Sequence, residues 1–438
     1  MPELASEAGL VEPEQPSAYK VATEHLQKHF PMKSGVISRI FRGESDKAVR
    51  AVDDVTFGIK EGEAFGLAGE SGCGKTTLGK TIIRLLDPTA GSIYFDGEEV
   101  TDIEGKQLKA YRREAQIIHQ DPYQSINPRF RVYRWVREPL DVHKIGTEEE
   151  RDARVYEVLE MAGLEPASEY AQEYPTELSG GERQRVGIAR ALALGPSFLM
   201  ADEPASMLDV SIRASVLEVF KNLQHELGMT SLYISHDLSL LKHICDRIGI
   251  MYLGQLVEVG PAAQIINDPQ HPYTQALVSS VPRIDPTADR NQIQLVGEVP
   301  DPVDVPQGCR FHPRCPKVVP PREFSFEQAE WRAVASLKYD LLKNELQVAE
   351  DVEEPTPDDV REFYEVPNPL TDERAEKLLA QAISDVIEED DTATDSLERL
   401  ESAFQTICAD PGPNMVDIGV DRRAMCVLHD ETLQGELS

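Results

Sequence analysis

The chain has 438 residues, of which 41% are hydrophobic, enough to bury one large core and leave material for an appended domain. Its formal net charge of −33 excludes a general nucleic-acid binder, because affinity for phosphate backbones comes from clustered Lys and Arg side chains. No segment approaches the roughly 18 consecutive apolar residues of a membrane-spanning helix, and the N-terminus carries no basic and apolar export signal, so we expect a cytosolic protein.

The negative charge is spread unevenly along the chain. Residues 324–438 carry 29 of the 77 acidic and 9 of the 44 basic residues, a net charge of −20, which leaves −13 for residues 1–323. Acidity in both parts resembles proteins of salt-accumulating halophiles, in which screening shortens the reach of self-repulsion, and favours a halophilic archaeal source. A single acidic tail is the alternative.

Residues 1–20 mix Glu, Pro, Ser and Ala without a period and predict a flexible acidic arm. From residue 21 to 281, short apolar runs alternate with helical patterns, which indicates an α/β fold. We expect buried strands at residues 64–68, 197–201 and 230–234, and helices at residues 76–86, 151–163 and 181–194. Polar residues follow each strand, at the edge where open parallel sheets place their chemistry.

A change in composition marks the end of this domain. Residues 282–316 are rich in Pro, Asp and Gly, and residues 317–438 are acidic and amphipathic, with a predicted helix at 370–387. We therefore expect a boundary at 281/282, a Pro-rich segment, and a helical accessory region.

Residues 69–76, with the sequence GESGCGKT, fit the phosphate-binding P-loop. A predicted strand precedes the loop and a predicted helix follows it, as the motif requires. Its glycines let backbone amides curl around phosphate oxygens, Lys75 reaches the β- and γ-phosphates, and the Thr76 hydroxyl ligates magnesium. Kinases, GTPases, helicases and ABC ATPases all remain open at this point.

Residues 178–185, with the sequence LSGGERQR, resemble the signature of the ABC ATPase family. Physically this segment is a second helix N-terminus, which offers a hydroxyl and backbone amides to phosphate oxygens, although Ser179 also suits a plain helix cap. The resemblance implies that the signature residues contact ATP held by a partner subunit; they are Ser179, Gly180, Gly181 and Glu182. It also implies a RecA-like core with antiparallel β and α-helical subdomains.

Further motifs fall in the order that the ABC family implies. Residues 197–203 resemble a Walker B strand, in which Asp202 holds magnesium and Glu203 acts as general base. His236 resembles the switch histidine, Asp209 lies in the D-loop, and Gln120 begins the Q-loop and faces magnesium and the γ-phosphate. The resemblance thus implies that Glu203, His236 and Gln120 are catalytic and that Thr76, Gln120 and Asp202 ligate magnesium. The ATP-binding residues that it implies are Phe30, Gly69, Glu70, Ser71, Gly72, Cys73, Gly74, Lys75, Thr76, Thr77, Gln120, Asp202 and His236. Phe30 is assigned to adenine stacking, with an ordinary core Phe as the alternative.

Four segments resemble the oligopeptide and dipeptide importer ATPases in particular: residues 120–129, 174–177, 271–277 and 308–316. The resemblance implies ATP and Mg²⁺ as cofactors and a location at the cytoplasmic side of the cell membrane. It also implies a dimer, homomeric or heteromeric, with a second ATPase subunit, two membrane permeases above it and an extracellular solute-binding protein. A soluble ABC ATPase of translation or DNA repair is the rival, but such proteins usually carry two cassettes or a long coiled-coil insertion, and this chain shows neither.

Cys309 and Cys315 match the first two cysteines of this family's C-terminal motif, which in some members holds a 4Fe–4S cluster. The next cysteines are Cys408 and Cys426, so we interpret residues 317–407 as an acidic insertion after which four thiolates reconvene. Four reduced thiols or a zinc site of the same ligands remain open. Cys73 and Cys245 are expected to pack rather than react.

Overall fold

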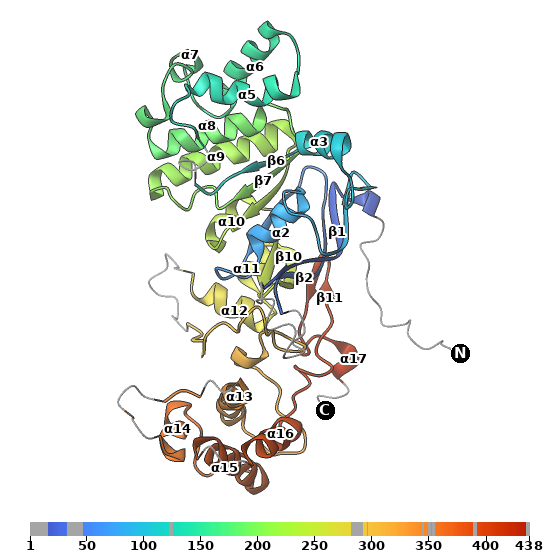
Figure 1. Cartoon of the computed structure of the whole chain (residues 1–438), viewed down its shortest axis with the longest axis vertical. Helices are drawn as coiled ribbons and strands as arrows, with labels where there is room; N and C mark the ends of the chain where they lie inside the picture. Colours follow the sequence, from blue (N-terminus) through green and yellow to red (C-terminus); the bar gives the residue numbers. More distant parts are fainter. Residues whose placement is uncertain are drawn as a thin grey trace, which may run out of the picture. The chain divides into compact units, whose positions relative to one another are not determined.

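The computed structural model describes residues 16–32, 47–121, 126–281, 292–295, 297–343, 346–348, 352, 355–388 and 392–434. It divides the chain into two compact units, unit 1 (Met1–Asp268) and unit 2 (Pro269–Ser438). Figure 1 colours the chain along its sequence, from blue at the N-terminus to red at the C-terminus. None of the helices among these described residues is long and apolar enough to span a membrane.

The two units meet between residues 268 and 269, and the boundary at 281/282 stays a prediction from composition. Within unit 2, the rings of His271 and Tyr273 lie against Phe311, with centroids 5.9 and 5.2 Å apart. These contacts attach the start of helix α12 (Pro272–Ser279) to unit 2.

Unit 1 opens with an antiparallel sheet. Its strands are β1 (Val21–Pro31), β2 (Ala48–Ile59), β4 (Ala90–Phe95) and β5 (Glu98–Glu99), in the order β2-β1-β4-β5. Residues 16–20 were predicted to belong to a flexible arm, but Pro16–Ala18 form a 3-10 turn and Lys20, only 8% exposed, donates to Asp96 at 2.7 Å. This part of the arm is therefore anchored on the sheet, and residues 1–15 lie outside the described residues.

The second sheet of unit 1 carries the buried strands expected from the sequence. Its unit 1 strands run in the order β10-β9-β3-β8-β7-β6, and all neighbours are parallel except the pair β9 and β10. Every residue of β3, β7 and β8 is buried, which explains their continuous apolar runs. Their bounds are β3 (Ala64–Ala68), β6 (Ala115–Ile118), β7 (Phe198–Asp202), β8 (Thr230–Ile234), β9 (Arg247–Tyr252) and β10 (Gln255–Pro261).

Helices α2 (Lys75–Ile82), α9 (Val210–Leu227), α10 (Leu238–Ile244) and α11 (Ala262–Asn267) follow β3, β7, β8 and β10 in turn, and α3 (Gly105–Glu114) precedes β6. Helix α2 is shorter than the predicted 76–86. It ends because Arg84 adopts a left-handed conformation with φ 55°, while its guanidinium donates to the carbonyl oxygens of Val100 and Thr101. No Gly or Pro signals this end before Pro88.

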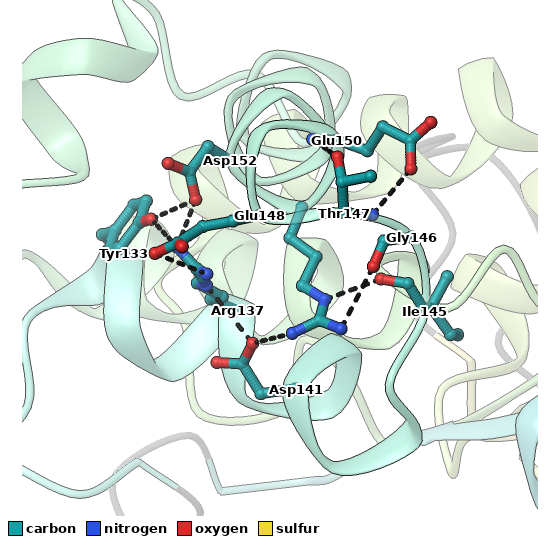
Figure 2. Close-up of polar contacts among 10 residues, drawn as sticks. Tyr133, Arg137, Asp141, Ile145, Gly146, Thr147, Glu148, Glu150 and Asp152 are labelled. Atoms are coloured by element: carbon teal, nitrogen blue, oxygen red, sulfur yellow. Dashed lines mark hydrogen bonds and ion pairs between the residues drawn. The ribbon is translucent and has the colours of Figure 1, made fainter.

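A helical group forms one end of unit 1 (Figure 1), with α5 (Val132–His143), α6 (Glu148–Met161), α7 (Ala167–Tyr170) and α8 (Gly180–Leu192). Figure 2 shows how the turn between α5 and α6 is fixed. Thr147 and Glu150 form a capping box at the start of α6. Arg137 of α5 donates to Tyr133 in its own helix and pairs with Asp152 of α6, so the two helices are joined side by side.

Unit 2 contains the accessory helices predicted from the sequence. They are α13 (Gln328–Lys343), α14 (Pro357–Phe363), α15 (Glu373–Ile387) and α16 (Ala393–Ala403), and the predicted helix at 370–387 corresponds to α15. Trp331 and Phe404 are fully buried and their ring centroids lie 6.0 Å apart, at the centre of an aromatic cluster. The hairpin of β11 (Val416–Gly419) and β12 (Arg422–Ala424) and the short helix α17 (Glu431–Gln434) follow.

Candidate nucleotide site

The site lies at the carboxyl edge of the parallel strands of unit 1. Strands β6, β7, β8 and β3 are adjacent and run in one direction, so the residues that follow them meet at the same edge. These residues are Gln120 after β6, Asp202 and Glu203 at β7, His236 after β8 and the loop 69–76 after β3. Four separate motifs of the sequence therefore converge in space.

The backbone of the P-loop depends on its glycines. Gly74 has φ 106° and caps the N-terminus of α2, and a Cβ there would lie 1.9 Å from the carbonyl oxygen of Ala51. Gly69 has φ 151°, and a Cβ would lie 2.2 Å from the carbonyl oxygen of Met251. Both positions exclude any side chain, so the loop can lie close against the backbone of β2 and β9.

Lys75 occupies the centre of this loop and is only 6% exposed. Its ammonium donates to the carbonyl oxygens of Gly69 and Glu70, both at 2.8 Å, and lies 3.6 Å from the sulfur of Cys73. Burial raises the pKa of the Cys73 thiol, although Lys75 opposes the shift, so Cys73 is a packed thiol as predicted. The loop thus concentrates positive charge and amide donors at the start of α2.

Thr76 and Asp202 form a ready pair of oxygen ligands. The hydroxyl of Thr76 donates to Oδ1 of Asp202 at 2.8 Å, and Asp202 is only 4% exposed. Burial raises the pKa of Asp202, opposed by the hydrogen bond from Thr76 and the charge of Lys80. One hydroxyl and one buried carboxylate beside the P-loop fit the hard oxygen ligands that Mg²⁺ prefers.

Glu203 is held between the other two predicted catalytic residues. Nε2 of Gln120 donates to its Oε2 at 3.1 Å, and Nδ1 of His236 lies 3.2 Å from its Oε1. The backbone of Glu203 has φ 45°, and its amide donates to the carbonyl oxygen of Ile234 in β8. The carboxylate therefore has a polar partner at each of its two oxygens.

The signature forms the N-terminus of α8. Ser179 caps the helix: its Oγ accepts from the amide of Glu182 at 3.3 Å, and its own amide donates to Oε2 of Glu182 at 2.7 Å. The amide of Arg183 donates to the carbonyl oxygen of Ser179. Within the described part of the chain, Gly180 and Gly181 are left as the first-turn amides available to an anion.

Several other predicted residues are placed by the fold. Asp209 caps α9 and accepts from the amide of Ile212 at 3.0 Å. Phe30 lies on β1 with 36% of its surface exposed and with the ammonium of Lys28 5.1 Å from its ring centroid, so it is not a core residue. Residues 122–125 of the predicted Q-loop lie outside the described residues.

One contact of the signature has no signal in the sequence. The hydroxyl of Tyr170, at the end of α7, donates to Oε1 of Glu182 at 3.0 Å. Only the fold of the helical group brings these two residues together.

The structure gathers the four C-terminal cysteines within unit 2, and all are buried. The amide of Cys309 donates to the carbonyl oxygen of Cys408 at 2.8 Å. Burial raises the pKa of Cys309 well above its usual value, with further contributions from Cys408, Cys315 and Cys426, so the thiols lie within electrostatic reach of one another. However, the described residues contain no group of three or more His, Cys, Asp or Glu side chains that could hold a metal ion as they stand.

Comparisons with known proteins match these features. A model of the ABC transporter family matches residues 52–206, and a model of the oligopeptide/dipeptide transporter C-terminal region matches residues 257–321. A domain of unknown function (DUF8228) matches residues 328–421, which include helices α13–α16.

Relatives of known family show the same affiliation. The putative oligopeptide transport ATP-binding protein YkfD of Bacillus subtilis is 49% identical over 283 residues, which cover 64% of this chain and 85% of YkfD. The oligopeptide transport ATP-binding protein AppF of the same organism is 47% identical over 298 residues, 67% of this chain and 88% of AppF. Among solved structures, the chain is similar to cbiO1 from Clostridium perfringens, which is part of the ABC transporter complex cbiONQ. The match covers 57% of this chain and 92% of the cbiO1 chain, with 26% identity and a TM-score of 0.50. The chain therefore belongs to the ATP-binding subunits of ABC transporters, in the oligopeptide/dipeptide importer family, whose ATP hydrolysis energises transport.

Proposed function

We propose that this chain hydrolyses ATP at a site shared with a second ATPase subunit, and that this drives import of oligopeptides or dipeptides through a membrane permease pair. The observation that carries the proposal is the convergence of Gln120, Asp202, Glu203 and His236 beside the P-loop, at one edge of the sheet. The names of the relatives YkfD and AppF support the choice of cargo class. The match to the oligopeptide/dipeptide C-terminal region speaks against a translation or repair ATPase.

Each residue has a role that follows from its position. The amides of residues 69–76 and the ammonium of Lys75 bind the phosphates of ATP. Thr76 and Asp202 hold Mg²⁺, which neutralises charge on the phosphates when bound. Glu203 orients and deprotonates the attacking water, while Gln120 and His236 keep its two oxygens in place.

The signature supplies the second half of the site. The amides of Gly180 and Gly181 and the hydroxyl of Ser179 face a γ-phosphate bound to the P-loop of the partner subunit. Because P-loop and signature belong to different subunits in each site, ATP favours the closed dimer over the open one, and hydrolysis reverses that preference. Phe30 stacks on adenine, as its exposure on β1 permits.

A mixing experiment tests the shared site. Lys75→Ala and Ser179→Ala variants of the full chain are each expected to lose most ATPase activity. If the chain pairs with itself, the mixture contains dimers in which an intact P-loop faces an intact signature, so activity should rise above that of either variant. If it pairs with a related subunit, the same two changes are placed on opposite subunits. A mixture no more active than the variants alone contradicts the shared site.

The buried thiols are the second part of the proposal. Cys309, Cys315, Cys408 and Cys426 supply the donor set of a 4Fe–4S cluster, or of zinc, and their gathering in unit 2 supports a four-thiolate site. The described residues contain no group of three or more His, Cys, Asp or Glu side chains that could hold a metal ion as they stand, so the proposed site needs the four thiols to move closer together. Protein purified without oxygen should contain iron and absorb broadly in the visible range. Zinc in place of iron would identify a zinc site of the same four ligands. Neither metal would identify four reduced thiols and would contradict the cluster.

The last part of the proposal concerns where the chain acts in the cell and the salt concentration at which it is stable. A chain without a described membrane-spanning helix reaches the membrane by docking beneath the permeases, and an extracellular solute-binding protein delivers the peptide. The net charge of −33 supports a halophilic setting, in which salt screens self-repulsion. Stability that rises steeply with KCl concentration would support this assignment, and stability that is insensitive to salt would contradict it.

A further inference from the structure

The contact between Tyr170 and the signature lies outside every motif considered above. Tyr170 is the last residue of the short helix α7, and Glu182 is the third residue of α8, twelve positions further along the chain. The hydroxyl of Tyr170 donates to Oε1 of Glu182 at 3.0 Å. The two side chains are part-buried, so this hydrogen bond is not a fully solvated surface contact.

Glu182 also binds the residue that caps the signature helix. Its Oε2 accepts from the amide of Ser179 at 2.7 Å, while its own amide donates to Oγ of Ser179 at 3.3 Å. Hydrogen bonds from Ser179, followed by that from Tyr170, lower the pKa of the Glu182 carboxyl. The carboxylate is therefore ionised and shared between Tyr170 on one oxygen and Ser179 on the other.

This sharing affects the groups that a γ-phosphate needs. The carboxylate of Glu182 is an anion within the same first turn that must receive phosphate oxygens, and its Oε2 already binds the amide of Ser179 at 2.7 Å. When Tyr170 satisfies Oε1, the carboxylate draws less on Ser179. When that donor is absent, the carboxylate can satisfy itself only by binding Ser179 more closely or by turning toward solvent.

We propose that Tyr170 is a positioning residue for ATP hydrolysis: it holds the Glu182 carboxylate to the side of the signature, so that Ser179, Gly180 and Gly181 remain available to the γ-phosphate on the partner subunit. The inference rests on the proposed role of the signature and adds to it a residue from α7. Tyr170 does not touch ATP in this account and acts only through Glu182.

The first test is Tyr170→Phe in the full chain, which removes the hydroxyl and keeps the ring. We expect kcat/KM for ATP to fall about three- to tenfold, as for the loss of one hydrogen bond that orients a catalytic group. Binding of an ATP analogue to the chain's own P-loop should be unchanged, because the hydroxyl that is removed binds Glu182 of the signature helix, and the P-loop residues 69–76 are left as they are. The matched control is Tyr156→Phe in α6. The ring of Tyr156 lies against the ring of Tyr133, a contact that does not need the hydroxyl. Hydrolysis by this variant should stay within about twofold of the parent rate.

A double-mutant cycle separates positioning from general packing. If Tyr170 acts through Glu182, the change Tyr170→Phe should have little further effect in a Glu182→Gln background, because the charge that it restrains is gone. Additive effects in the cycle would mean that Tyr170 acts elsewhere, and they would overturn the inference. So would a Tyr170→Phe variant with the parent kcat/KM.

A third arm distinguishes this inference from the function on which it rests. Ser179→Ala should lower hydrolysis strongly while the P-loop still binds the analogue. If Ser179→Ala is without effect, the proposed role of the signature fails. If Ser179→Ala acts as expected and Tyr170→Phe does not, only the role of Tyr170 fails.

Discussion

Replacing the general base of the site without changing its shape tests the chemistry assigned to Glu203. In Glu203→Gln, one carboxylate oxygen becomes an amide nitrogen of nearly the same size. The remaining oxygen can accept from Nε2 of Gln120, which now lies 3.1 Å from Oε2. The new nitrogen can donate to Nδ1 of His236, 3.2 Å from Oε1, when that nitrogen carries no proton. The local hydrogen bonds can therefore survive, and the capacity to accept a proton is what is lost.

The expected cost follows from this separation. Removing a general base typically lowers the rate about 10²- to 10⁴-fold, or about 3–5 kcal/mol of transition-state stabilisation. Binding of ATP should persist, because Lys75, Thr76 and Asp202 are unchanged. Steady-state hydrolysis and binding of a fluorescent ATP analogue, measured on the same preparations, report the two quantities. Turnover within about threefold of the parent would refute the role given to Glu203.

Three further predictions concern stability and packing. Arg137→Ala removes the guanidinium that joins α5 to α6 (Figure 2) and should lower the free energy of unfolding of unit 1 by about 1–2 kcal/mol, measured by denaturant titration, whereas Arg137→Lys should recover part of it. Gly181→Val should reduce both stability and hydrolysis, because its Cβ would lie 2.2 Å from Cγ2 of Ile212 and force α8 and α9 apart; an unchanged melting temperature would contradict this packing. Burial lowers the pKa of Lys338 to about 8, and its ammonium donates to the carbonyl oxygen of Phe404. Between pH 8 and its ordinary pKa of 10.5, the unfolded chain keeps this proton and the folded chain loses it, so stability should gain a contribution as pH rises through this window, and Lys338→Met should remove that contribution from the unfolding curves.

Local signals in the sequence were sufficient to predict the edge of the sheet at which the candidate site lies. The strands that precede the P-loop and Asp202 are buried on both faces, so they appear as continuous apolar runs followed at once by Gly or by carboxylates. Because parallel strands place such ends at one edge, the sequence indicates that the P-loop, Glu203 and His236 lie close together. Gln120 was placed with them only by the resemblance of residues 117–122 to a Q-loop, since no strand was predicted before it.

Features that depend on distant contacts could not be read in the same way. The end of α2 is set by Arg84 bonding to carbonyl oxygens of residues 100 and 101, and no helix-stop residue announces it. The pairing of Tyr170 with Glu182 arises from the packing of α7 beside α8. The contacts of His271 and Tyr273 with Phe311 likewise join residues far apart in the sequence, and no local pattern indicates them.

The cysteines illustrate both cases. Their approach across residues 317–407 was predicted from a family pattern, and the backbone hydrogen bond from the amide of Cys309 to the carbonyl oxygen of Cys408 is consistent with it. Whether four thiols bind iron depends on sulfur positions and on metal supply, neither of which composition or spacing encodes.

The most direct test of the central claim is peptide uptake by cells in which the native gene is replaced by the Glu203→Gln variant. We expect uptake of a labelled oligopeptide to be lost while the variant is present at the parent level and still binds ATP. Uptake at the parent rate in those cells would contradict the claim that hydrolysis by this chain drives import.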